Sequence, residues 1–237
     1  MVTINVETVP ANKGEKQIVE KVLKLVEDRN ISIAKNFSEN PKDVNVKLFY
    51  SASSLRVKLD PNGEGMGVFA GYIDGSDEIL IVHPDSVNGL FTDLWKEMSV
   101  IIDYSLVKLY LCKKYYPKRE DFKMYYKYVS EILAQVVSGK FKEDIAKFDM
   151  KTYFEGKKYK KEQELGIVLY LMREYSGTQF IFEHLDKIMR DCDIKKTIFS
   201  IYKKSFSELI KPEHEKLLEE EKKLRQKFKT KKPFKNR

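Results

Sequence analysis

The stretch from Leu90 to Lys113 constrains the fold more than any other part of the sequence. Its apolar side chains recur at the period of an α-helix and cover more than one face, which predicts a helix buried at the centre of the molecule. Lys96 and Glu97 interrupt this apolar stretch. Because lysine and glutamate side chains are rarely buried without partners, we expect this dipeptide to face a cleft or to form ion pairs.

The first third of the chain predicts one helix and a small sheet. Residues 13–29 carry an apolar face at helical spacing. Period-two alternation and short apolar runs between turn residues predict four strands, over 44–50, 55–59, 66–73 and 78–82. The last two are joined by Asp74-Gly75-Ser76-Asp77, which favours a hairpin. We therefore expect a small, mixed or antiparallel N-terminal sheet.

No strand is expected after Asp85, and the C-terminal portion is predicted to be mostly helical. The expected helices cover 120–137, 162–175, 178–190 and 193–203, and 140–161 is expected to be a loop with one helical turn near Asp144. Ser205-Phe206-Ser207-Glu208 has the spacing of a capping box and predicts one further helix. Strands first and helices afterwards predict an α+β fold. We expect one domain over 1–210 and a basic helical or disordered tail over 211–237, fraying from Lys222 onward.

Composition places the chain among globular proteins. It has 237 residues, 42 % of them hydrophobic and 12 % aromatic, which is enough to bury a core. No apolar run reaches the roughly 20 residues of a membrane span, and the N-terminus lacks the pattern of a signal peptide. The two cysteines have no metal-binding spacing and are interpreted as free thiols. We therefore expect a cytoplasmic protein that does not bind membranes.

Several stretches follow one another in an order that resembles a known family. Residues 68–72 and 78–82 are similar to a strand pair that precedes a catalytic helix, and 94–101 to that helix. Residues 128–135 are similar to a helix that carries a glutamate ligand, and 165–177 to the helix after it. The family is the gluzincin metallopeptidases of the broad peptidase-MA-like superfamily. The resemblance spans about residues 44 to 210 and implies an N-terminal sheet with a central helix behind it.

The zinc ligands that the resemblance implies are mostly replaced. Gluzincins carry His-Glu-x-x-His on the central helix, because two histidines one helical turn apart provide half of a tetrahedral zinc site. In this sequence the two histidine positions are Lys96 and Val100, neither of which binds zinc, and the general-base position is Glu97. Glu131 falls on the position of the third ligand.

The remaining positions of the family also differ. The tyrosine that often stabilises the oxyanion in related aminopeptidases would fall near Lys161, with Tyr159 two residues away. The chain has three histidines, and none is paired with another at helical spacing. We therefore expect a degenerate site with no metal and no cofactor. Either the Lys96 ammonium takes the place of the metal and pairs with Glu131, or Lys96 and Glu97 lie on the exposed edge of the helix.

Three functions follow as hypotheses. The first is a catalytically inactive metallopeptidase-like protein that binds a peptide or protein through the former substrate cleft or an exposed sheet edge. The second is a hydrolase that uses Glu97 and Glu131 on an unknown substrate or with a different metal. The third is nucleic-acid binding through the basic residues of the C-terminal tail, Lys222, Lys223, Arg225, Lys227, Lys229, Lys231 and Lys232. The sequence does not determine the oligomeric state.

Overall fold

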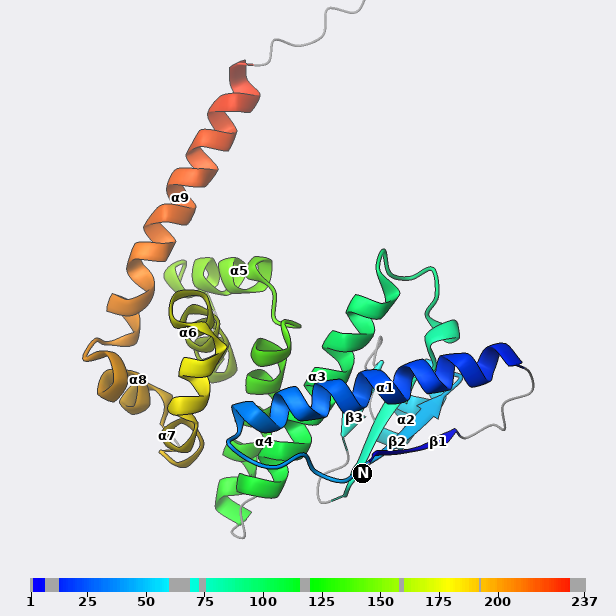
Figure 1. Cartoon of the computed structure of the whole chain (residues 1–237). Helices are drawn as coiled ribbons and strands as arrows, with labels where there is room; N and C mark the ends of the chain where they lie inside the picture. The colour runs from blue at the N-terminus through cyan, green and yellow to red at the C-terminus, as the bar shows by residue number, and fades with distance from the viewer. Residues whose placement is uncertain are drawn as a thin grey trace, which may run out of the picture.

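The computed structural model describes residues 2–6, 13–59, 69–72, 76–115, 120–157, 160–191 and 193–230. The fold is a mixed α+β fold, with the strands near the N-terminus and helices after them, as the sequence predicts (Figure 1). The N-terminal elements are β1 (Val2–Val6), α1 (Lys13–Asn36), β2 (Val44–Phe49), α2 (Ala52–Leu59), β3 (Ala70–Tyr72) and β4 (Glu78–Val82). After a 3₁₀ turn at Pro84–Ser86, the helices are α3 (Leu94–Tyr115), α4 (Glu120–Ser138), α5 (Glu143–Phe154), α6 (Lys161–Glu183), α7 (Leu185–Arg190), α8 (Ile194–Tyr202) and α9 (Phe206–Thr230).

The sheet is mixed, with strand order β1-β2-β4-β3. β1, β2 and β4 are parallel, and β3 is antiparallel to β4, as the expected hairpin requires. β1 was missed in the prediction from sequence, although Val2, Ile4 and Val6 alternate with polar residues at the period of a strand. The structure identifies it by its parallel pairing with β2.

Helices cover both faces of the sheet. On one face, alternate residues of β2 and β4, including Val46 and Ile79, belong to the main core with α1 and α3. On the other face, Leu80 and Val82 form a smaller core with Leu55 of α2. Because successive strand residues point to opposite sides, this division follows directly from the apolar runs of β2 and β4.

The predicted strand over 55–59 is wrong, because these residues belong to α2. The Ser51 hydroxyl accepts hydrogen bonds from the backbone N–H groups of Ser53 and Ser54 and so caps the start of a helix. In a helix Leu55 is buried, whereas Val57 is 58 % exposed. A strand would have placed Leu55 and Val57 on the same face.

The predicted central helix is confirmed as α3. It begins at Leu94, after Asp93 accepts a hydrogen bond from the Lys96 backbone N–H, and Leu90 lies before it, 66 % exposed. The second half of α3, from Ile101 to Cys112, is buried except for Lys108. α3 packs against α1, against β3 and β4, and against α4, so most other layers contact it.

The expected loop over 140–161 is also wrong, because α5 occupies Glu143–Phe154. Ala146 and Met150 are buried four residues apart and provide the inward face, while Phe148 is exposed. Acidic residues in the first turn favour a helix N-terminus there. The narrow apolar face and the surrounding lysines concealed this helix in the sequence.

The later helices agree more closely with the sequence. The predicted break at Ser176-Gly177 is confirmed, since Gly177 has a φ of 80° inside α6. The capping box is also confirmed, with the Ser205 N–H donating to the Glu208 carboxylate and the Glu208 N–H donating to the Ser205 hydroxyl. The prediction that the chain frays from Lys222 is wrong, because α9 continues to Thr230 through the expected domain boundary at 210/211. In the described residues, no helix is both long and apolar enough to cross a bilayer.

Candidate functional site

A groove between α1 and the first turns of α3 is the largest of three hollows described here, at about 380 Å³. Leu25 and Trp95 provide its apolar surface, and Trp95 is half-buried. The remaining lining side chains are polar or charged: Lys21, Lys24, Asp28, Asp93, Lys96 and Ser99. Two predicted features therefore meet here, the start of the central helix and the charged dipeptide that interrupts its apolar stretch.

Parallel packing of α1 against α3 positions the two walls of the groove. The Lys21 ammonium lies 3.7 Å from the centre of a Trp95 ring, a cation–π contact. Two turns further along both helices, the Arg29 guanidinium binds the Asp103 carboxylate, with Nε 2.6 Å from Oδ1. These contacts fix the relative position of the helices, so the groove is formed by rigid elements instead of by loops.

The polar groups of the groove leave two ammonium groups available. The Asp93 carboxylate accepts the Lys96 backbone N–H, and the Ser99 hydroxyl donates to the Trp95 carbonyl. Lys24 and Lys96 are exposed, and neither ammonium forms an ion pair with a residue that the structure describes. The groove thus presents an aromatic ring beside three lysines, which outnumber its two carboxylates, those of Asp28 and Asp93.

The predicted site residues do not form one site. Lys96 lines the groove, and Glu97 and Val100 are half-buried beside it on α3. Glu131, on α4, instead contacts the second half of α3. Its carboxylate accepts hydrogen bonds from the Tyr104 hydroxyl at 2.5 Å and from the Lys108 ammonium at 3.0 Å.

The predicted ion pair between Lys96 and Glu131 is therefore wrong, because the Lys108 ammonium occupies that place. Lys108 lies twelve residues after Lys96, which is about 18 Å along the helix axis at about 1.5 Å per residue. Glu97 is similarly separated from Tyr104 by seven residues, or about 10 Å. Consequently Glu97 and Glu131 do not form an acid–base pair.

Glu131 is held in its ionised form. Burial alone would raise the pKa of this carboxyl group, but the nearby Lys108 charge and hydrogen bonds from Tyr104, Gln135 and Lys108 outweigh it and hold the pKa below its ordinary value. Gln135 donates from the next turn of α4 at 2.7 Å. The exposed Lys140 adds a second cation, with its ammonium 4.3 Å from the centre of the Tyr104 ring. This cluster links α3 to α4, and no described hollow opens onto it.

The other positions implied by the resemblance contribute no further site. Lys161 is exposed at the first residue of α6, and Tyr159 lies outside the described residues. Among the residues that the structure describes, no group of three or more His, Cys, Asp or Glu side chains is placed to hold a metal ion.

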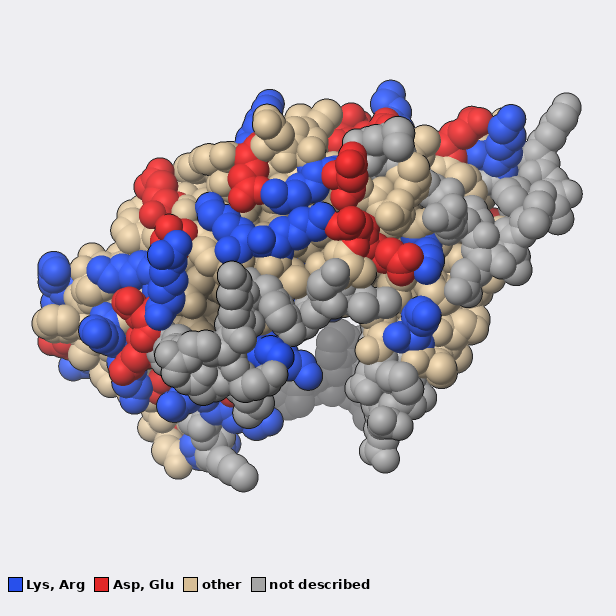
Figure 2. Space-filling model, turned by 90° about the horizontal axis from the view of Figure 1, so that it is seen from below, with Lys and Arg blue, Asp and Glu red and all other residues tan. Residues whose placement is uncertain are grey.

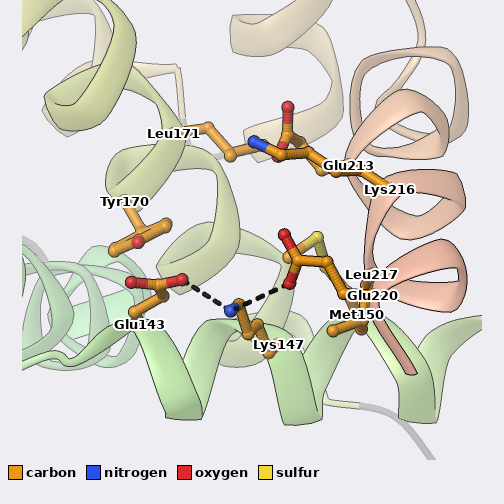
Figure 3. Close-up of a pocket in the computed structure, with 9 residues that line it drawn as sticks. All are labelled: Glu143, Lys147, Met150, Tyr170, Leu171, Glu213, Lys216, Leu217 and Glu220. Carbon is orange, nitrogen blue, oxygen red and sulfur yellow. Dashed lines mark ion pairs between the residues drawn. The ribbon is translucent and has the colours of Figure 1, made fainter. Parts of the chain in front are cut away.

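A second hollow lies between α5, α6 and α9, but it is only about 60 Å³ in volume (Figure 3). The Lys147 ammonium lies at its centre, 2.6 Å from a Glu143 oxygen and 3.6 Å from a Glu220 oxygen. Its central lysine is paired on both sides, and its volume suits no more than a few water molecules. We therefore interpret it as a structural contact between α9 and α5.

A third hollow, of about 270 Å³, lies where the ends of α1 and α3 meet α6 and α7. The Tyr115 hydroxyl crosses it to donate a hydrogen bond to Asp186. Burial and the adjacent carboxylate raise the pKa of Tyr115, so this hydroxyl remains protonated. It is a fixed donor that joins α3 to α7 and has no acid–base role near neutral pH.

The basic residues proposed for nucleic-acid binding extend along the end of α9. Lys222, Lys223, Arg225 and Lys227 are exposed, Lys229 belongs to the same helix, and Lys231 and Lys232 lie outside the described residues. On the face shown in Figure 2, by contrast, basic side chains lie among acidic ones. At the C-terminal end of α9, from Lys222 onward, the charged residues are all basic.

Sequence reasoning missed Lys21, Lys24 and Trp95 in the groove and Tyr104 and Lys108 beside Glu131. The first three come from two helices, and nothing in the sequence shows that these helices pack in parallel. For Lys108 a signal existed, because its charge interrupts the most apolar half of the central helix. Comparisons with models of protein families, with curated protein sequences and with solved structures each find no significant match for this chain.

Proposed function

We propose that this protein is a non-catalytic peptide-binding module, and that the groove between α1 and α3 receives an acidic segment of a partner protein. The observation that carries this proposal is the juxtaposition of Trp95 with the ammonium groups of Lys21, Lys24 and Lys96. An aromatic surface beside cations is suited to an apolar side chain flanked by carboxylates. Leu25 and Trp95 would contact the apolar side chain, and Lys24 and Lys96 would contact the acidic ones.

The groove is a better candidate than the β3 edge of the sheet. Addition of a strand requires exposed backbone groups along an edge strand. At the β3 edge, Ala70 and Tyr72 are buried, at 8 % and 6 % exposure. The groove instead offers exposed side chains on two rigid helices.

A degenerate metallopeptidase-like site remains part of the proposal, at a different position on α3. Tyr104 and Lys108 are one helical turn apart, and both contact Glu131. A pair of side chains at this spacing opposite a glutamate is the arrangement that two histidines and a glutamate would need for zinc. In this interpretation the Lys108 ammonium, and not that of Lys96, replaces the metal charge.

The hydrolase alternative has less support. It needs Glu97 and Glu131 near one substrate atom, and a general acid needs a raised pKa. The two carboxylates contact different parts of α3, and the pKa of Glu131 is lowered. We also infer a reducing compartment such as the cytoplasm, because the buried Cys112 carries a free thiol.

Binding can be tested with the intrinsic fluorescence of Trp95, which is the sole tryptophan of the chain. The probe is a synthetic peptide with a central leucine flanked by glutamates and without aromatic residues. We expect it to change Trp95 emission saturably, and a matched peptide with lysines in place of the glutamates to have no effect. Removing two attractive charges with Lys24→Gln/Lys96→Gln should weaken binding about ten-fold, since rim charges contribute up to about 1 kcal/mol each.

The matched control is Lys127→Gln/Lys187→Gln, which removes two exposed charges from other helices. Equal binding of the two peptides would show that charge does not contribute to recognition and would overturn the proposal. Equal loss in the two variants would show that general charge attraction, and not the groove, explains binding of the acidic peptide. Cleavage of the peptide, detected by mass spectrometry, would overturn the non-catalytic assignment.

The degenerate site has a separate test through metal content. We expect Tyr104→His/Lys108→His to take up about one zinc ion, held by the two new imidazoles and Glu131. The control Lys96→His/Val100→His should take up none, because Glu131 does not face those positions. Zinc uptake by the control variant alone would restore the original assignment of Lys96 and Val100, and circular dichroism checks that both variants fold.

A further inference from the structure

The last turns of α9 form a feature that the peptide-binding groove does not involve. Two ion pairs join α9 to α5, Glu220 with Lys147 and Glu221 with Lys151, at 3.6 and 3.0 Å. Beyond them the helix continues to Thr230, and Figure 1 shows its end extending past the other helices. We call residues 222–230 the distal segment. It contains five basic residues and no acidic one.

The basic residues of the distal segment form two stripes. Lys222, Arg225 and Lys229 recur at intervals of three and four residues, and Lys223 and Lys227 are four residues apart. Adjacent positions of an α-helix are about 100° apart, so the two stripes run along the helix on separate sides. Each stripe is a row of cations that a neighbouring row of anions would match.

One basic stripe faces away from the body of the protein, and the other lies on a flank, because Lys227 follows Glu220 by seven residues. Leu217 lines the small hollow against α5 and α6, and Leu224 lies seven residues later on the same side of α9. The basic stripes occupy the flanks and the opposite side. A large partner therefore reaches both stripes without meeting α5.

From this geometry we propose that the distal segment of α9 lies in the major groove of duplex DNA, with one basic stripe on the phosphates of each strand. The major groove of B-form DNA admits an α-helix and is bordered by two phosphate backbones. Contacts to phosphates position a protein without reading sequence, so binding is independent of sequence. The major groove of A-form RNA is too narrow for this arrangement.

A membrane surface fits the segment less well. A helix that lies in a bilayer interface needs a broad apolar face opposite its basic one. The apolar residues of the distal segment are Leu224, which is 54 % exposed, and Phe228 four positions later, and two residues at this spacing form a narrow stripe and not a broad face. The side of the helix that carries Leu224 faces the body of the protein. In addition, a planar membrane surface contacts only one side of a helix, whereas the basic residues follow two sides.

The test is fluorescence anisotropy with the full-length protein and a labelled DNA duplex of about 20 base pairs, or two helical turns. Five phosphate contacts predict that the logarithm of the affinity falls with the logarithm of the salt concentration with a slope of about −4.5. Lys222→Gln/Arg225→Gln removes charge from one stripe, and Lys223→Gln/Lys227→Gln from the other. Each variant is expected to reduce the magnitude of the slope by about 2.

The charge-matched control is again Lys127→Gln/Lys187→Gln, which should retain the wild-type slope. An equal reduction in this control would overturn the proposal, because it would assign binding to the overall positive charge. Equal affinity for single-stranded DNA or for duplex RNA would overturn the major-groove geometry. Binding to vesicles that contain phosphatidylserine, without binding to DNA at low salt, would assign the segment to a membrane surface instead.

Discussion

The ion pair between Arg29 and Asp103 is expected to determine how firmly α1 and α3 hold the proposed groove. The guanidinium binds the carboxylate through two nitrogens, Nε to Oδ1 and NH2 to Oδ2. The Asp103 side chain is only 9 % exposed, whereas that of Arg29 is 36 % exposed. Removing the arginine would thus leave a buried carboxylate without a counter-charge, whereas removing the aspartate would leave a cation that still reaches water.

The expected energies differ accordingly. Breaking a buried ion pair from one side costs about 3–5 kcal/mol in general. Because water still reaches the site along Arg29, we expect Arg29→Met to lower the free energy of unfolding by about 3 kcal/mol, at the lower end of this range. Asp103→Leu should cost less, about 1–2 kcal/mol. The double variant, which leaves no buried charge, should cost no more than Asp103→Leu alone.

Urea unfolding followed by far-ultraviolet circular dichroism measures all four proteins. The expected double-mutant cycle gives a coupling energy of about 2 kcal/mol or more, which is within the range for residues in direct contact. Additive losses in the two single variants would mean that the two side chains are not coupled. A loss below about 0.5 kcal/mol for Arg29→Met would be no larger than the effect of an ordinary surface substitution. Either result would refute the argument that the pair is a buried, coupled contact between α1 and α3.

Three further variants test other parts of the structure by their free energies of unfolding. Glu131→Gln should lower the free energy of unfolding at neutral pH. Because the pKa of Glu131 is lowered in the folded state, the stability difference between wild type and variant should shrink as the pH falls below about 4.3, the ordinary glutamate pKa. A stability difference independent of pH would contradict the Lys108 pairing. Gly166→Ala places a Cβ 2.8 Å from the Phe141 ring. The cost of overpacking, about 1–3 kcal/mol, should exceed the roughly 1 kcal/mol gained in helix propensity, so the variant should be less stable. Unchanged stability would show that the ring has room to move. Ser205→Ala removes the capping box of α9 and should cost about 1 kcal/mol, whereas an unchanged urea midpoint would show that packing alone starts this helix.

The parts of the fold that the sequence predicted are those that local periodicity determines. In α3 and in β2 the spacing of apolar residues within the element itself predicts which face is buried, so both elements were identified from the sequence. Errors arose where a short segment fits two periods. Leu55 and Leu59 lie on one face in a strand and also in a helix, and the capping hydroxyl of Ser51 favours the helix.

The candidate site was harder to predict because it depends on the relative position of helices. Lys96 was identified from its place in an apolar helix, but its neighbours in the groove come from α1, about 70 positions earlier in the chain. Glu131 was placed opposite the wrong turn of α3, since a spacing along the sequence does not determine how two helices are aligned when they pack. Only the Lys108 contact in the structure resolves that alignment.

The length of α9 has an electrostatic consequence. Glu219, Glu220 and Glu221 precede the distal segment, so the helix as a whole looks nearly balanced in charge. Lys227 and Lys229 nevertheless lie six and eight residues beyond Glu221, which is about 9 and 12 Å along the axis. At physiological ionic strength the Debye length is about 8 Å. Dissolved ions therefore screen the last turns of the helix from this acidic turn, so the two regions act electrostatically as separate patches of opposite sign.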